Sequence, residues 1–120
     1  MFSLIKQTCQ PCKSGVKPLN TNDAQAMLEQ LNGWFLSDDN KAIQQDFCFK
    51  NYYQTIAFVN AVAWIAHQQN HHPEMNVSHG HCLINYSTHT IDGLSENDFI
   101  CAAKIDALFA THSQETHGQT

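Results

Sequence analysis

Residues 52–70 constrain the fold most, because their apolar side chains recur at helical spacing on more than one face. One row consists of Ile56, Val59, Ala63 and Ala66, and another consists of Phe58, Val62 and Ile65. A helix that is apolar on several faces must be buried on several sides. In a chain of 120 residues, this pattern predicts a core helix that also contacts a second subunit. Asn51 is placed to cap its start, and Pro73 disfavours helical backbone at His72, so the helix should end near Asn70.

The segments around this helix predict a regular order of helices and strands. The expected elements are a helix within 20–33, strands at 34–36 and 42–49, the helix at 52–70, strands at 75–77 and 82–88, and a helix from 95 to about 110. Asn20 or Thr21 caps the first helix, and Ser95 with Asp98 forms a capping box at the last. Short antiparallel strands with helices on one face give an α+β two-layer fold of order α-β-β-α-β-β-α.

The expected organisation is an irregular arm at 1–18, one domain at 19–110 and a flexible tail at 111–120. The 11 acidic residues outnumber the six basic ones, for a net charge of −5. This balance argues against a protein that binds nucleic acid through phosphate contacts. The longest apolar-rich stretch, 56–66, is shorter than the roughly 20 residues of a membrane span, and the opening residues are too short an apolar run for a signal peptide. We therefore expect a soluble cytoplasmic protein that binds no membrane.

The five cysteines are odd in number and scattered along the chain. This distribution does not predict a disulfide framework. Cys9 and Cys12 form a lone C-x-x-C beside Pro11 near the N-terminus. A structural zinc site needs a second pair of ligands, and a redox C-x-x-C should follow a strand and open a helix. We therefore expect this motif to be chemically idle.

Histidines gather where the long helix should end, in a chain with eight histidines. His67 and His71 are four residues apart and share a helix face. The helix dipole at a C-terminus favours the imidazolium and raises the pKa of a histidine. Pro73 turns His72 off the helical path, so that adjacent rings can aim at one point from different directions. Such groups can both give and take a proton near neutrality, which general acid–base catalysis requires.

Two other interpretations of these histidines stay open. A histidine near a helix C-terminus can simply cap free carbonyl groups or lie at the surface. H-x-x-x-H-H also offers imidazoles to a metal, with His79, His81 or His89 as further ligands. The zincin pattern needs a glutamate directly after the first histidine, where this chain has Gln68. We therefore expect no metal site.

The histidines occur within a longer pattern, and the chain resembles the pterin-4a-carbinolamine dehydratases. His67, His71, His72, Pro73, His89 and Asp98 match the family's pattern in order and in spacing. The segment at 87–106 is similar to the family's later segment, and 9–34 is similar to the N-terminal region of many bacterial members. The resemblance covers about residues 9–108.

The resemblance implies a lyase that dehydrates 4a-hydroxytetrahydropterin to quinonoid dihydropterin and water, and so recycles the pterin of aromatic amino acid hydroxylases such as phenylalanine hydroxylase. His72 and His89 would act at the leaving hydroxyl, and His71 in proton transfer or ring positioning. The substrate-binding residues would be Trp34, His67, Pro73 and Asp98. It also implies a four-stranded antiparallel sheet with three helices, a homodimer or homotetramer, and no cofactor, since the pterin is the substrate.

Asp98 has two interpretations, a site residue and a helix cap, and both stay open. The chain departs from the family at His79, where an aromatic is usual, and at His67 and Asn70, where carboxylates are frequent. Two alternatives from the same family also remain. The chain could be a pterin-binding or protein-interaction module, such as a dimerisation cofactor, or it could serve molybdopterin metabolism.

Overall fold

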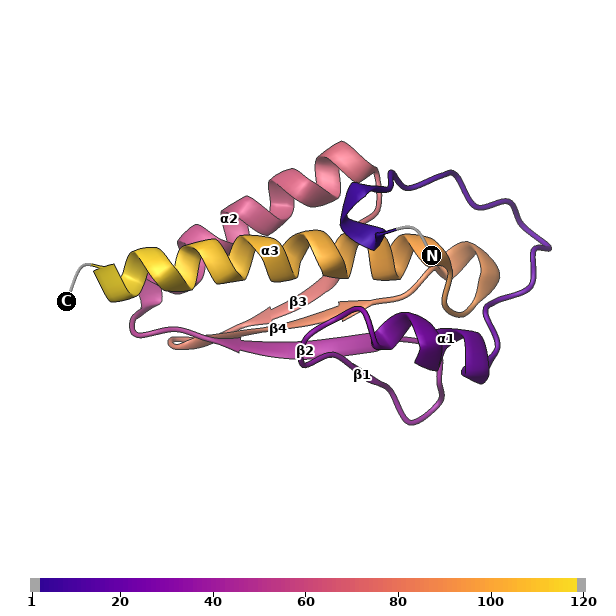
Figure 1. Cartoon of the computed structure of the whole chain (residues 1–120), viewed down its shortest axis with the longest axis horizontal. Coiled ribbons are helices and arrows are strands. Elements are labelled where there is room, and N and C mark those ends of the chain that lie inside the picture. Colours follow the sequence, from indigo (N-terminus) through magenta and orange to yellow (C-terminus); the bar gives the residue numbers. More distant parts are fainter. Residues whose placement is uncertain (1–2, 119–120) are drawn as a thin grey trace.

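The computed structural model describes the backbone of residues 3–118 and the side chains of residues 3–110. The elements are α1 (Thr21–Leu28), β1 (Phe35–Leu36), β2 (Ile43–Cys48), α2 (Tyr52–Gln69), β3 (Glu74–Val77), β4 (His81–Tyr86) and α3 (Glu96–Gly118). They confirm the predicted α+β class, the order α-β-β-α-β-β-α and the four-stranded antiparallel sheet. In Figure 1, α2 and α3 lie side by side over one face of the sheet, and α1 lies at its β1 end.

The sheet has the order β1-β2-β4-β3, and every neighbouring pair is antiparallel. β2 and β4 pair along their whole length and supply alternate side chains to the core, as the period of two in a strand requires. The buried strand residues are Ile43, Phe47, Cys82, Ile84 and Tyr86. They pack against α2 and α3, so the core lies between the sheet and these two helices.

One face of α2 is buried, and its ends lie where the sequence predicts them. Thr55, Phe58, Val62 and Ala66 are the buried residues of this helix. The Asn51 side chain accepts a hydrogen bond from Gln54 N at 2.8 Å, as expected of an N-cap. Within residues 3–118, no helix is long and apolar enough to cross a membrane.

α2 ends in a Schellman motif, which leads the chain directly into the histidine pair. Asn70 has left-handed backbone with φ +51°. The Asn70 N–H bonds the His67 carbonyl at 3.2 Å, and the His71 N–H bonds the Ala66 carbonyl at 3.1 Å. This is the 5→2 and 6→1 pattern of the motif. Asparagine tolerates left-handed backbone better than most residues, which explains its use here.

The capping box of α3 is confirmed. The Ser95 hydroxyl accepts from Asn97 N at 3.2 Å, and the Asp98 carboxylate accepts from Ser95 N at 3.0 Å. The expected end near Ala110 is wrong, because the backbone remains helical to Gly118. No proline or glycine occurs between these positions to stop the helix. The side chains of the predicted tail at 111–120 lie outside the part of the chain that the structure describes.

α1 ends earlier than predicted, at Leu28 instead of near Asn32–Gly33. The Gln30 N–H bonds the Met27 carbonyl, and the Leu31 N–H bonds the Leu28 carbonyl, each at 3.0 Å. These i→i+3 bonds tighten the last turn and end the α-helix. The predicted N-cap is confirmed, since Asn20 accepts from Asp23 N at 2.8 Å.

The N-terminal arm packs against α3 (Figure 1), although residues 3–18 contain only one short 3-10 turn, Leu4–Lys6. Leu4 is buried in the core, and Lys104 Nζ of α3 donates to the Ile5 carbonyl at 2.7 Å. Asn97 binds Gln10 twice: its amide nitrogen donates to the Gln10 carbonyl at 2.6 Å, and its oxygen accepts from Gln10 N at 3.0 Å. The arm is therefore attached to α3 at two places.

Candidate active site

The carboxylate of Asp98 is the centre of the candidate site. It is completely buried in the first turn of α3. Asp98 Oδ1 lies 2.6 Å from His71 Nε2. Asp98 Oδ2 accepts from the Thr88 hydroxyl at 2.9 Å and from Ser95 N at 3.0 Å. One oxygen therefore binds the histidine, and the other completes the helix cap, which confirms the helix-cap interpretation of Asp98.

The His71 ring is fixed on two sides. It stacks on the buried Tyr86 with ring centroids 5.3 Å apart and an interplanar angle of 15°. The Tyr86 hydroxyl also donates to the His71 carbonyl at 3.2 Å. Burial lowers the pKa of His71, but the hydrogen bond and the negative charge of Asp98 outweigh it, so the pKa is raised above its usual value. His71 can therefore carry a proton near neutrality.

Asp98 also brings His72 and His89 to the same end of the molecule. His72 follows His71, which binds one carboxylate oxygen, and His89 follows Thr88, which binds the other. Consecutive Cα atoms are about 3.8 Å apart. Each of these histidines therefore lies next to a residue that hydrogen-bonds the Asp98 carboxylate. Both side chains are exposed and can meet a molecule from solvent.

A cleft of about 380 Å³ opens beside His71. The end of α2, Thr88 and Asn97 form part of its lining, and Cys9–Cys12 of the arm form another part. The cleft is therefore walled by a segment that lies 59 to 62 residues before His71 in the sequence. Its size falls in the range of small-molecule sites.

Three other predicted site residues lie around or away from this group. Pro73 is half-buried and directly precedes β3. The exposed His67 lies one helical turn before His71, and its ring is tilted 30° against Trp64 at a centroid distance of 5.7 Å. Trp34 is buried, and its indole nitrogen donates to Asp106 at 2.8 Å. Asp106 is eight residues beyond Asp98 in α3, or roughly 12 Å along the helix, so the structure does not join Trp34 to His71.

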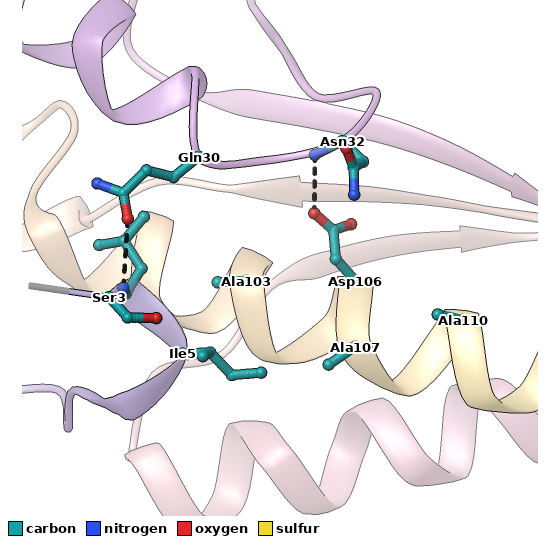
Figure 2. Close-up of a pocket in the computed structure, with 9 residues that line it drawn as sticks. Ser3, Ile5, Gln30, Asn32, Ala103, Asp106, Ala107 and Ala110 are labelled. Carbon is teal, nitrogen blue, oxygen red and sulfur yellow. Dashed lines mark hydrogen bonds between the residues drawn. The ribbon is translucent and has the colours of Figure 1, made fainter.

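Asp106 lies at a second, smaller cavity between the arm and α3, of about 280 Å³. Figure 2 shows its carboxylate directed toward Asn32, whose backbone N–H donates to it at 3.0 Å. Burial raises the pKa of Asp106, and the N–H donors of Asn32 and Trp34 partly offset that effect. The carboxylate already has partners, so it stabilises the turn before β1.

The remaining histidines of the described chain do not converge on the cleft. His79 stacks on Tyr52 at 6.5 Å and 18°, at the opposite end of α2 from His71. His81 Nδ1 lies 3.0 Å from Asp46 Oδ1 across β2 and β4. Among the described residues, no three His, Cys, Asp or Glu side chains form a group that could hold a metal ion. The departure at His79 therefore affects a site remote from Asp98.

The structure adds several residues that the sequence did not indicate. Tyr86 and Thr88 support His71 and Asp98, and the alternation of buried residues in β4 is the signal that could have found Tyr86. Asn97 and the arm could not be found in this way, because their contact spans 87 residues of sequence. Sequence spacing carries information only about contacts within an element or between neighbouring elements.

Comparisons with known proteins show which family the chain resembles. The sequence profile of the family described as Pterin 4 alpha carbinolamine dehydratase matches residues 17–108. A protein of Nitrosomonas eutropha with the provisional name pterin-4-alpha-carbinolamine dehydratase is 56% identical over 106 residues, covering 88% of this chain and 92% of that protein. A protein of Dechloromonas aromatica with the same provisional name is 46% identical over 106 residues, covering 88% and 93%.

Two solved structures are also similar. The transcriptional coactivator/pterin dehydratase of Brucella melitensis is 28% identical with a TM-score of 0.73, covering 77% of this chain and 98% of that one. A pterin dehydratase-like protein identified as a RuBisCO assembly factor in the alpha-carboxysome is 26% identical with a TM-score of 0.57, covering 65% and 90%. The profile match and the two bacterial relatives lead to one conclusion: this chain belongs to the pterin 4 alpha carbinolamine dehydratase family.

Proposed function

We propose that this protein dehydrates 4a-hydroxytetrahydropterin to quinonoid dihydropterin and water by histidine acid–base catalysis. The observation that carries the proposal is the 2.6 Å contact between His71 and the buried carboxylate of Asp98 beside an open cleft. Family membership supports a pterin as the substrate, and the contact supports a histidine that is fixed in orientation and whose pKa is raised above its usual value.

The reaction needs only two proton movements. The C4a–O bond breaks, and the leaving hydroxyl takes a proton from a general acid and departs as water. The N5–H bond breaks, and its electron pair forms the C4a=N5 double bond as a base accepts the proton. No electrons leave the substrate, so no redox cofactor is required, and a histidine acid can assist the leaving hydroxyl without a metal. We therefore propose that neither takes part. Histidines with different pKa values can serve as the acid and the base.

We assign His72 and His89 to the leaving hydroxyl, and His71 to proton transfer or to positioning of the pterin ring. The exposed position of His72 and His89 supports direct contact with a substrate. The buried Asp98 and the stacked Tyr86 support a fixed His71. Pro73 and His67 lie at the margin of this group, whereas Trp34 would reach a bound pterin only from a more distant position.

The test is dehydration of freshly generated 4a-hydroxytetrahydropterin, followed by ultraviolet absorbance with and without a strong chelator. The wild type should accelerate the reaction equally in both conditions. His72→Ala and His89→Ala should each lose at least about 100-fold in kcat while remaining folded. His79→Ala is the matched control, because this histidine lies at the opposite end of α2.

Other outcomes would contradict specific parts of the proposal. Loss of activity with chelator would show that a metal takes part. No acceleration by the wild type would reject the dehydratase, and retention of a pterin in equilibrium dialysis would then favour a binding role. Unfolding of His72→Ala would show that this residue is structural.

We further propose that the natural role is recycling of the pterin used by an aromatic amino acid hydroxylase such as phenylalanine hydroxylase, and that the working form is a homodimer or homotetramer. The exposed face of α2 supports the assembly, since Tyr53 and Trp64 are 83% and 60% exposed there. Tyr53 and Trp64 share one helix face, because 11 residues are close to three whole turns, and protein interfaces are enriched in such aromatic side chains. A second copy of the chain is the proposed occupant.

A further inference from the structure

Cys9 and Cys101 lie together beside the candidate active site, although 92 residues separate them. Their sulfur atoms are 3.6 Å apart. Cys101 is completely buried in α3, three residues after Asp98. Cys9 is half-buried in the arm and lines the cleft that contains His71. A molecule in the cleft can therefore reach the Cys9 sulfur, which contacts the buried sulfur of Cys101.

The other half of the C-x-x-C motif has a different partner. The Cys12 sulfur accepts from the Asn97 amide at 3.4 Å. The Cys9 backbone N–H donates to the Gln69 side chain at 2.8 Å, which sets the position of Cys9 over α3. The described contacts therefore pair Cys9 with Cys101 and not with Cys12.

Little movement separates the two thiols from a covalent bond. A disulfide has an S–S distance of about 2.05 Å, so the sulfurs must approach by roughly 1.5 Å. Cys101 belongs to a long helix, but Cys9 belongs to an arm without regular secondary structure at that point. A shift of the arm or rotation of the Cys9 side chain can supply the approach.

We propose that Cys9 and Cys101 are an oxidisable thiol pair, whose disulfide ties the N-terminal arm to α3 as a fixed wall of the His71 cleft. The expectation that the C-x-x-C motif is chemically idle would then fail for Cys9. The proposal does not depend on the dehydratase reaction, because it rests on the contact between the two sulfurs.

The oxidant is a hydroperoxide, and the chemistry balances with hydrogen peroxide. The Cys9 sulfur accepts one peroxide oxygen to give a sulfenic acid, and the first water leaves. The Cys101 sulfur then attacks the Cys9 sulfur, and the S–OH bond breaks. The departing hydroxide takes the proton of the Cys101 thiol and leaves as the second water. Two thiols lose two electrons in total, and one peroxide is reduced to two waters.

Access favours Cys9 for the first step, because Cys9 lines the cleft and Cys101 is completely buried, although the raised pKa of Cys9 makes this step the slow one. The charges around the pair favour the second step. The pKa of Cys101 is lowered, chiefly by the hydrogen bond from Cys9, and burial only partly opposes this effect. The hydrogen bond with Cys101 and burial raise the pKa of Cys9. Cys101 therefore forms a thiolate more readily than Cys9 and is suited to the attacking role.

The test uses the full-length protein, treated with hydrogen peroxide, alkylated without reductant and digested with trypsin. Cleavage after lysine places Cys9 and Cys12 in peptide 7–13 and places Cys82 and Cys101 in peptide 51–104. We expect these two peptides to be linked, with loss of two hydrogens, and to separate after dithiothreitol. The link should persist in Cys12→Ser and in Cys82→Ser, which leaves Cys101 as the one cysteine of peptide 51–104, and disappear in Cys9→Ser.

Several results would overturn the proposal. A disulfide within peptide 7–13 as the main product would show that Cys9 pairs with Cys12. A link that survives in Cys9→Ser would assign the chemistry to Cys12. Failure of peroxide to link the peptides, while the exposed Cys48 is oxidised in the same sample, would show that the pair does not react. A parallel sample of Cys48→Ser excludes disulfides that form between the exposed Cys48 side chains of two molecules.

Discussion

At the residue scale, Asp98 combines two tasks that ordinarily fall to different side chains. Its Oδ2 atom completes the cap of α3, and its Oδ1 atom binds His71. A buried carboxylate is costly unless hydrogen bonds surround it, and here Thr88 provides a third. The helix cap therefore places a negative charge beside the histidine, and the cap is part of the site.

The two tasks can be separated by substitution. Asp98→Asn keeps an oxygen that can accept from Ser95 N but removes the charge, so we expect kcat to fall at least about tenfold with the fold retained. Ser95→Ala removes the hydroxyl that caps Asn97 N and contacts Thr88 at 2.7 Å but leaves the Asp98–His71 contact in place. It should lower the free energy of unfolding by about 1 kcal/mol with little change in kcat. Steady-state kinetics and urea unfolding of both variants measure the difference. Equal losses of activity would contradict the division of tasks.

The raised pKa of His71 predicts how the stability of the protein depends on pH. A pKa that is higher in the folded state stabilises the protein fully below the unfolded value, which is 6.5 for this group. That contribution is lost as the pH rises through the folded pKa. The free energy of unfolding of the wild type, relative to His71→Gln, should therefore fall as the pH rises from 6 to 9.

Urea unfolding at a series of pH values measures this change. His89→Gln is the matched control, because it removes an exposed histidine that does not contact Asp98. Its pH dependence should follow that of the wild type. A constant difference between the wild type and His71→Gln across this range would show that Asp98 does not stabilise a charged His71.

At the scale of elements, the end of α2 determines where the histidine pair lies. The Schellman motif needs left-handed backbone at residue 70, where φ is +51°. Asn70→Gly should retain the motif and cost only a few tenths of a kcal/mol, because glycine adopts this backbone without strain. Asn70→Ala should lower the free energy of unfolding by roughly 1 kcal/mol, because alanine pays the left-handed penalty. Asn70→Ala should also lower kcat, because a distorted turn misplaces His71 and His72.

Urea unfolding and kinetics of the two variants test the role of this turn. The matched comparison is Asn51→Ala at the other end of α2, which removes a cap of similar strength. Asn51→Ala should destabilise the protein without changing kcat. If Asn70→Ala retained full activity, the turn would not be what positions the histidines.

Local sequence signals predicted the elements well. The two wrong helix ends, of α1 and α3, depend on features that such signals do not carry. The N-caps at Asn20, Asn51 and Ser95 depend on bonds within three residues, and a sequence shows such spacing directly. The end of α1 depends on 3-10 hydrogen bonds that composition does not reveal. The end of α3 was placed by polarity alone, although a helix can continue through polar residues when no breaker intervenes.

Part of the candidate site could be predicted from the sequence, and part could not. His71 and Asp98 follow from helix-end chemistry and from the family pattern, and the structure places them in contact. Their common carboxylate also explains why His89 lies near the pair. The arm, Cys9 and Cys101 depend on contacts across most of the chain. The partnership of Trp34 with Asp106 is similarly non-local, with 72 residues between them.

At the scale of the whole molecule, the arm and the exposed face of α2 determine what other molecules can reach. Residues 9–12 of the arm form one side of the His71 cleft, so a molecule bound in the cleft would contact the arm. The exposed face of α2 carries Tyr53, Asn60, Trp64 and His67 at helical spacing. His67 lies one turn before the histidine pair, so an assembly through this face would bring a second subunit close to the candidate site.

This placement makes Trp64 the most direct test of the assembly. A tryptophan at the centre of an interface contributes about 2 kcal/mol or more, which is roughly a 30-fold change in the dissociation constant. Sedimentation velocity should show a dimer or tetramer for the wild type and smaller species for Trp64→Lys at the same concentration. Val16→Lys is the matched control, since it adds the same charge at an arm residue of similar exposure, 52% against 60%.

A monomeric wild type, or equal assembly of Trp64→Lys and Val16→Lys, would reject α2 as the contact. If assembly weakens and kcat falls with it, the second subunit supports the histidine site through His67. If assembly weakens and kcat is unchanged, each subunit carries a complete site of its own.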